Sequence, residues 1–255
     1  MSGFGLLLRK ELLEQTRTMR LYVVAIVFAL FAIVSPLTAK YLPEIIKALA
    51  GDQLSLVGLI STPIIADAVD QFLKNLTQFG ALAAILLAMG TVATEKDRGT
   101  AAFILTKPVS RAAFLVAKLV AVAANLLVAT VVAGVLAYYY TLVLFGSLPV
   151  GGFVAMCALL WLSLVVYASL TFLGSTLTSS AAAGAGIGVV FLVVTGIVSA
   201  LPTVGRYMPE TLVVPARALA LGQPASDLAG PVAVNVAIVL AAVLLAWLSF
   251  RRQEL

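Results

Sequence analysis

The residues best able to do chemistry in this chain are the charged side chains of one stretch, residues 94–111, which reads TEKDRGTAAFILTKPVSR. Long apolar runs precede and follow it. Opposite charges placed this close together can pair with one another or with a complementary partner surface. We therefore interpret the stretch as a docking element, and its charged members are Glu95, Lys96, Asp97, Arg98, Lys107 and Arg111.

Catalytic and metal-binding groups are scarce elsewhere. Because the chain contains 0 histidines, histidine-based nucleophilic catalysis and histidine-ligated metal sites are excluded. No GxxxxGK(S/T) phosphate-binding loop occurs, so the chain has no visible means of hydrolysing ATP. Cys157 lies alone in an apolar run, and we interpret it as a small buried residue. We expect no catalytic residue, metal or cofactor in this chain.

The composition indicates an integral membrane protein. The 255 residues are 62% hydrophobic and 11% charged, whereas soluble domains carry about 25% charged residues. The apolar runs have the length of about 20 residues that crosses a ~30 Å hydrocarbon layer. We predict an all-α fold forming one transmembrane domain over residues 1–255, with six spans at residues 21–38, 72–93, 114–144, 153–173, 181–200 and 231–250.

The segments outside these spans have mixed character. In residues 3–20, apolar residues such as Phe4 recur every four positions opposite charged ones, which predicts an amphipathic helix in the membrane interface. A signal peptide is the alternative, but the acidic Glu11 and Glu14 argue against it. Residues 40–71 and 201–229 combine charges, prolines and apolar residues, and we interpret both as segments on the outer face.

The distribution of basic residues predicts the topology. Six spans put both termini on one side, and Lys and Arg favour the cytoplasmic side. The side that holds the termini and the 94–111 stretch has 11 of the 16 cations, which predicts that both termini are cytoplasmic in the cell membrane. Those cations are Arg9, Lys10, Arg17, Arg20, Lys96, Arg98, Lys107, Arg111, Lys118, Arg251 and Arg252.

The polar residues inside the spans are neutral. Asn125, Ser163 and Asn235 lie within the third, fourth and sixth spans. Such residues usually form hydrogen bonds between helices, and lining a translocation path is the alternative. Ion-coupled carriers place ionisable residues in the membrane, so a permease of this composition would need energy from another subunit.

Small residues mark one face of the fifth span. Gly184 and Gly188 lie four positions apart, a spacing that lets helices approach closely. The pattern favours packing within one subunit, and a subunit interface is the alternative.

The central stretch has the local signals of a short helix between two breaks. Gly99 interrupts the helix that precedes it, and Thr100 is a candidate N-cap. Pro108 ends the segment, and Ser110 is a candidate N-cap of the third span. The short helix would present an apolar patch rimmed by charge, which favours docking to a partner over a loop lying on lipid headgroups. The patch consists of Ala102, Phe103 and Leu105.

The run Glu95-x-x-x-Gly99-Thr100, followed by Lys107-Pro108-Val109-Ser110-Arg111 and Lys118, resembles the first cytoplasmic loop of ABC-type exporter permeases of the type-two class. The resemblance extends over nearly the whole chain and is nearest to permeases of nitrous-oxide-reductase maturation and gliding-type systems. It implies a coupling helix that enters a cleft on a separate ATP-binding subunit, which holds the ATP and Mg. Docking would then involve Glu95, Gly99, Thr100, Ala102, Phe103, Leu105, Lys107, Pro108 and Arg111.

The resemblance also implies partners: the ATP-binding subunit, a second copy or relative of this permease, and membrane lipid, with no nucleic acid. The function that the sequence favours is therefore the membrane subunit of an ATP-driven exporter. A membrane scaffold or assembly subunit is the alternative, and a membrane enzyme is disfavoured by the missing catalytic groups. The cargo, and whether the permeases pair as identical or different chains, stay open.

Overall fold

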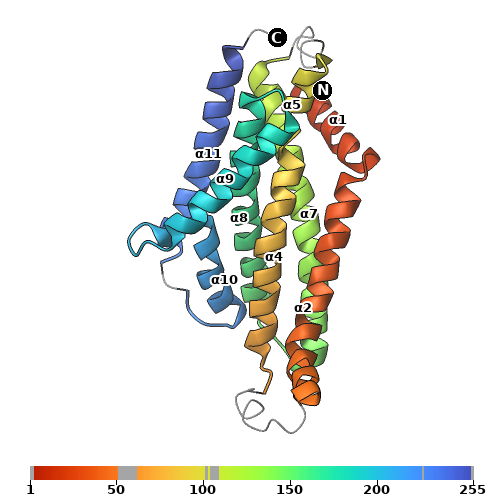
Figure 1. The fold of residues 1–255 in the computed structure, drawn as a ribbon, viewed down its shortest axis with the longest axis vertical. Coiled ribbons are helices and arrows are strands. Elements are labelled where there is room, and N and C mark those ends of the chain that lie inside the picture. Colours follow the sequence, from red (N-terminus) through yellow and green to blue (C-terminus); the bar gives the residue numbers. More distant parts are fainter. Residues whose placement is uncertain (1–2, 51–61, 101–102, 104–108, 226, 254–255) are drawn as a thin grey trace.

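The computed structural model describes residues 3–50, 62–100, 103, 109–225 and 227–253, and this part of the chain is helical with no strands (Figure 1). Within it, six helices are long and apolar enough to cross a membrane, which confirms the predicted all-α fold with six spans. They are α2 (Arg20–Ala50), α4 with its continuation α5 (Ile65–Ala88 and Ala93–Asp97), α7 (Arg111–Phe145), α8 (Val150–Leu177), α9 (Ala181–Ser199) and α11 (Ala229–Arg251).

Both termini lie at one end of the bundle, together with α1 (Gly3–Arg17) and α5 (Figure 1). We call this the terminal end and the opposite one the distal end. Helix α1 precedes the first span, where an amphipathic helix was predicted, and it packs against α7 and α2.

Helix α8 is the centre of the bundle because α4, α7, α9, α10 and α11 all pack against it. Its apolar composition on every side suits a helix that is surrounded by protein. Near its distal end, the ring of Phe153 stacks on Phe72 of α4 and meets Tyr138 of α7 edge-on. Helices α9 and α11, in contrast, leave most of their surface uncovered by this chain.

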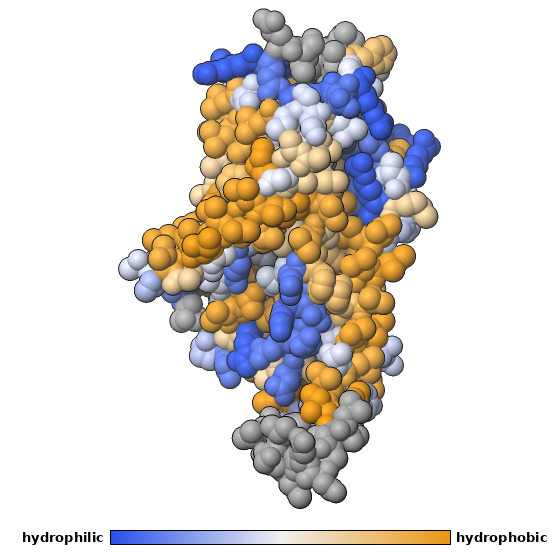
Figure 2. All heavy atoms as spheres, viewed as in Figure 1, coloured by the Kyte–Doolittle hydropathy of each residue, from blue (hydrophilic) through white to orange (hydrophobic). Residues whose placement is uncertain are grey.

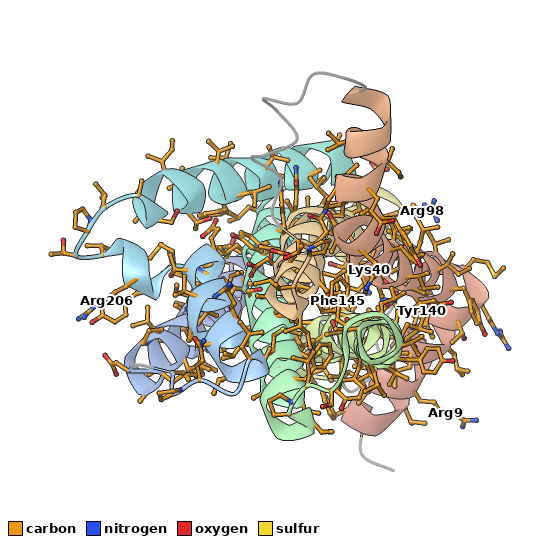
Figure 3. The ribbon with its side chains drawn as sticks, turned by 90° about the horizontal axis from the view of Figure 1, so that it is seen from below. Arg9, Lys40, Arg98, Tyr140, Phe145 and Arg206 are labelled. Carbon is orange, nitrogen blue, oxygen red and sulfur yellow. The ribbon has the colours of Figure 1, made fainter. Side chains whose placement is uncertain are left out.

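The first outer segment differs from the prediction. Residues 40–71 were expected to form a segment outside the first two spans, but α2 continues through Pro36 and Pro43 to Ala50 and α4 already begins at Ile65. Lys40 secures the extension, because its ammonium donates to the Leu144 carbonyl at 3.0 Å and lies over the Phe145 ring (Figure 3).

The second span also ends differently. A continuous helix over residues 72–93 was expected, but α4 stops at Ala88 and a turn over residues 89–92 precedes α5. The Ser175 hydroxyl of α8 accepts the Val92 and Ala93 amides at 3.2 and 3.0 Å, which satisfies backbone groups that the turn leaves without helical partners. Gly99, the predicted break, adopts a φ of +68° and ends this region.

The remaining spans begin near their predicted positions. Ser110 caps α7 as predicted, accepting the Ala113 amide at 3.1 Å. The second outer segment folds into two short 3-10 helices, η1 (Gly205–Tyr207) and η2 (Pro209–Leu212), followed by α10 (Val213–Ala220). Helix α10 lies directly on α8 at Gly152, where an added Cβ would fall 1.9 Å from the Leu219 carbonyl oxygen.

Candidate functional site

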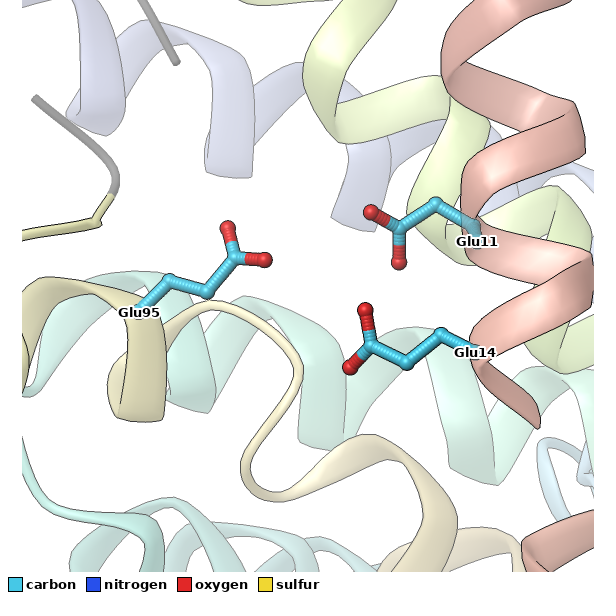
Figure 4. A group of neighbouring side chains, drawn as sticks. All are labelled: Glu11, Glu14 and Glu95. Atoms are coloured by element: carbon cyan, nitrogen blue, oxygen red, sulfur yellow. The ribbon is translucent and has the colours of Figure 1, made fainter. Parts of the chain in front are cut away.

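The terminal end collects charged residues from helices that are distant in sequence. Glu11 and Glu14 project from α1 toward Glu95 of α5 (Figure 4). Lys118 reaches the same space from α7 and is only 2% exposed. We call Lys10, Glu11, Glu14, Glu95 and Lys118 the charge cluster.

Two lysines hold the three carboxylates of the charge cluster together. The Lys118 ammonium lies 2.8 Å from Glu95 Oε1 and 3.1 Å from Glu11 Oε1. The Lys10 ammonium lies 2.9 Å from Glu11, 3.0 Å from Glu95 and 3.1 Å from Glu14. Glu95 therefore connects the helix that leads into the 94–111 stretch with both α1 and α7.

These contacts shift the ionisation of the partly exposed members. Burial opposes the charged form of Lys10, but its hydrogen bond to Glu11 and the charge of Glu95 outweigh it and raise the pKa of Lys10 above its usual range. For Glu14, burial acts to raise the pKa, but the charge of Lys10 and its hydrogen bond lower it below the usual value. Both groups are therefore charged near neutral pH.

Three carboxylates can also hold a metal ion, and here one oxygen each of Glu11, Glu14 and Glu95 lie within 4.8 Å of one another. The two ammonium groups, however, already lie within 3.1 Å of these same carboxylates. The geometry therefore fits an internal ion-pair network that joins three helices, rather than a metal centre.

The neighbouring cations of the loop cap the ends of other helices. Arg111 donates to the carbonyls of Phe250, Arg251 and Gln253 at 2.8, 3.1 and 3.1 Å, after the last turn of α11. Lys96 donates to the Thr176 carbonyl of α8 at 3.0 Å. Cations are favourable at helix C-termini, so these residues stabilise the packing of the loop on the bundle.

The predicted docking residues are only partly described. Ala102, Leu105, Lys107 and Pro108 lie outside the described residues. The Thr100 hydroxyl donates to the Glu95 carbonyl at 3.2 Å, and its role as an N-cap stays a prediction. Phe103 is 69% exposed and lines the rim of a cavity of about 550 Å³ whose walls include Glu14, Glu95 and Arg98.

The neutral polar residues of the spans mainly form structural hydrogen bonds. Asn125 donates to Gln15 of α1 at 2.9 Å, and Asn235 donates to the Tyr207 carbonyl at 3.0 Å, so each joins its helix to another segment. The Ser163 hydroxyl donates within its own helix, to Leu160. None of the three lines the cavity beside Phe103.

Gly184 and Gly188 lie on the face of α9 that packs within this chain. A Cβ on Gly184 would fall 2.6 Å from the Met89 carbonyl oxygen, and one on Gly188 would fall 2.3 Å from the Thr171 hydroxyl of α8. Their close spacing therefore serves the contact of α9 with α8 and the end of α4.

Sequence reasoning assigned no site role to Lys10, Glu11 or Gln15, and it used Lys118 only for topology and as part of a motif. A signal was present, because Lys118 is a charged residue inside a long apolar helix and such residues normally pair. Glu11 and Gln15, four residues apart, share the face of α1 that is buried on α7.

The whole sequence matches a known family. The family described as ABC-2 family transporter protein matches residues 6–255, and the chain belongs to it. The chain is also 31% identical over 257 residues to the uncharacterized transmembrane protein YxlG of Bacillus subtilis (strain 168), and the match covers 97% of each chain. The protein is therefore an ABC-2 transporter membrane subunit, of a family that is normally the non-catalytic partner of an ATPase.

Proposed function

We propose that this chain is the permease subunit of an ATP-driven exporter and moves in response to a separate ATP-binding subunit that holds the ATP and Mg. Its family supports the association with an ATPase. In this proposal two permeases pair in the cell membrane, as identical or related chains, with both termini and the 94–111 stretch in the cytoplasm.

The observation that carries the proposal is the position of Glu95. This residue lies between the loop and the bundle and is tied to Lys10 of α1 and Lys118 of α7 at 3.0 and 2.8 Å. A push on the loop would therefore be transmitted to α1 and to the third span, α7, through ion pairs rather than through a flexible linker. Closure of an ATPase dimer around ATP could use this connection to tilt the spans, as rigid-body transitions require.

The docking contact would be the exposed surface around Phe103. The aromatic ring suits insertion into an apolar cleft, because aromatic anchors in pockets provide much of the binding energy of an interface. Arg98 and Thr100, which line the same cavity as Phe103, would form the polar rim.

Co-purification with the ATP-binding subunit tests this contact. The permease should be co-expressed with the ATPase encoded beside it, and Phe103→Asp should reduce the recovered ATPase at least about tenfold, because a buried unpaired charge is costly. Phe103→Leu is the matched control and should retain most of the assembly. Undiminished recovery with Phe103→Asp would count against docking through this residue.

The alternative is a membrane scaffold that binds no ATPase and moves no cargo. The same preparation distinguishes the two functions, because a scaffold would recover no ATPase with the wild-type chain. If an ATPase is recovered, ATP-dependent transport into inverted vesicles should be lost in the partner's hydrolysis-deficient variant.

A further inference from the structure

One face of α4 lines a series of adjoining cavities. Residues at four-residue intervals along it are polar toward the distal end (Asp70, Lys74, Gln78) and apolar in the middle (Leu82, Leu86). Leu82 lines both an apolar groove of about 500 Å³ and a more distal cavity of about 510 Å³, which we call the outer cavity. Figure 2 shows the polar patch on the distal half of the molecule, bordered by apolar surface.

The outer cavity contains buried polar atoms without partners. Tyr167 of α8 is 1% exposed and lines the cavity, and its hydroxyl lies close to Glu210 and Thr195 without a hydrogen bond of normal geometry. Glu210 of η2 accepts a hydrogen bond from Thr195 at 2.7 Å through Oε1, but its buried Oε2 has no partner. The hydroxyl of Thr77 on α4 is also buried and unpartnered.

Tyr167 lies deep in α8, a helix long enough to span a membrane, and Glu210 and Thr77 line the same cavity from η2 and α4. At a rise of 1.5 Å per residue, Tyr167 is about 15 Å from the terminal end of α8 and about 25 Å from its other end. Unsatisfied polar groups in such an environment are costly, so persistent ones indicate a place for a ligand or water.

The charges of the outer cavity favour a cationic ligand. Asp70 is already paired with Arg217 of α10, whereas Glu210 has no ion pair within the described residues. Lys74 also lines the cavity, but its side chain is exposed rather than buried. The Oε2 atom of Glu210 and the hydroxyls of Tyr167 and Thr77 are together suited to accept the three N–H groups of a primary ammonium.

The apolar groove adds the second part of the ligand. It lies between α2 and α4, and its walls include Val23, Val27, Phe79 and Leu86. Because Leu82 lines both the groove and the outer cavity, an alkyl chain in the groove would end beside the cavity that Glu210 lines. We propose that the outer cavity and the groove bind an amphiphile with a protonated primary amine. If the proposed export function holds, such amphiphiles are the class of cargo.

Binding of three probes that share one chain length tests the proposal. The purified full-length protein in lipid nanodiscs should bind radiolabelled dodecylammonium, and unlabelled dodecylammonium should compete much better than dodecanol or dodecyl sulfate. Glu210→Gln should weaken dodecylammonium binding about tenfold or more, since it removes the charge but keeps the oxygen that accepts from Thr195. Tyr167→Phe should weaken it about threefold, with little cost to folding because the hydroxyl forms no hydrogen bond of normal geometry.

Lys74→Met is the matched control in the same cavity. It removes a charge of opposite sign and should leave dodecylammonium binding unchanged or tighter. Equal binding of dodecylammonium by the wild-type protein and by a folded Glu210→Gln variant would overturn the proposal. Equal competition by dodecyl sulfate would do the same, and either result would leave a cavity that holds only water.

The two proposals fail separately. Glu210-dependent binding without recovery of an ATPase would support the proposed ammonium site and contradict the proposed exporter function. Recovery of the ATPase with no Glu210-dependent binding would support the proposed exporter function and contradict the proposed ammonium site. Chromatographic and thermal behaviour like that of the wild-type protein identifies variants that have folded.

Discussion

The charge cluster and the outer cavity both place carboxylates inside the same helical bundle, but they differ in how these carboxylates are paired with cations. In the charge cluster, every carboxylate lies within 3.1 Å of a lysine. In the outer cavity, the carboxylate of Glu210 has one neutral donor and no cation within the described residues. Each region leaves one buried carboxylate oxygen without a hydrogen-bond partner, Glu95 Oε2 in the charge cluster and Glu210 Oε2 in the outer cavity, so the two regions differ in the ion pairing of these carboxylates. Paired charges rigidify a buried network. This difference fits our proposals that the charge cluster transmits movement and that the outer cavity binds a ligand.

The largest expected effect comes from removing the central cation of the charge cluster. Lys118→Met should lower the free energy of unfolding by about 3–5 kcal/mol, because Glu11 and Glu95 would keep their buried charges with Lys10 as the remaining partner. Denaturation in mixed micelles measures the change. Arg9→Met is the control, since Arg9 is an exposed cation of α1 without an ion pair in the described part of the chain (Figure 3), and it should change stability by less than about 0.5 kcal/mol. Similar losses of unfolding free energy for Lys118→Met and Arg9→Met would contradict a stabilising role for the ion pairs of the charge cluster.

An intermediate loss of stability is expected from a change in α9, the helix that lies between the charge cluster and the outer cavity. Gly184→Ala should destabilise the protein by about 1–3 kcal/mol, because its Cβ would meet the backbone oxygen of Met89, which cannot rotate away. Gly186→Ala on the same helix has nothing within 4 Å of its Cβ and should be neutral or slightly stabilising. Thermal unfolding of the two variants in detergent provides the comparison, and equal midpoints would show that α9 does not pack on Met89 as described.

The smallest effect tests the exposed edge of the charge cluster by pH. The lowered pKa of Glu14 means that the unfolded chain binds a proton more readily than the folded one, so the Lys10 contact contributes stability above the usual carboxyl pKa of 4.5 and loses it as pH falls. Glu14→Gln should cost less than about 1 kcal/mol near neutral pH, since the pair is half exposed. The difference from the wild-type protein should shrink as the pH falls below 4.5 and disappear once the pH is below the lowered pKa of Glu14 in the folded protein. A difference that stays constant with pH would mean that the charge of Glu14 is not responsible.

Local rules predicted part of the candidate site. Ser110 was recognised as an N-cap and Gly99 as a break because each depends on a residue type and its immediate neighbours. The charge cluster depends on Lys118 meeting Glu11, which lies 107 positions away in the chain, and no local pattern encodes that distance. The position of Lys118 within an apolar helix indicated that this residue pairs with another group, but it did not identify the partner.

Helix ends were predicted less well where neighbours override propensity. Pro36 and Pro43 would usually end a helix, yet α2 continues past both while packed along α7 and α4. The turn after Ala88 contains no proline, and it depends on the Ser175 hydroxyl of α8 to satisfy two amides. In both places a contact from another helix decided the backbone.

By itself, the sequence determined the membrane-spanning fold, the number of candidate spans and the family, because apolar runs of sufficient length must become helices in a bilayer. It also determined which stretch is charged. Only the tertiary structure decided which charges are paired. Pairing depends on helices α1, α5 and α7 meeting at the terminal end, and on η2 bringing Glu210 beside α8 and α9, where it forms no ion pair with any described residue.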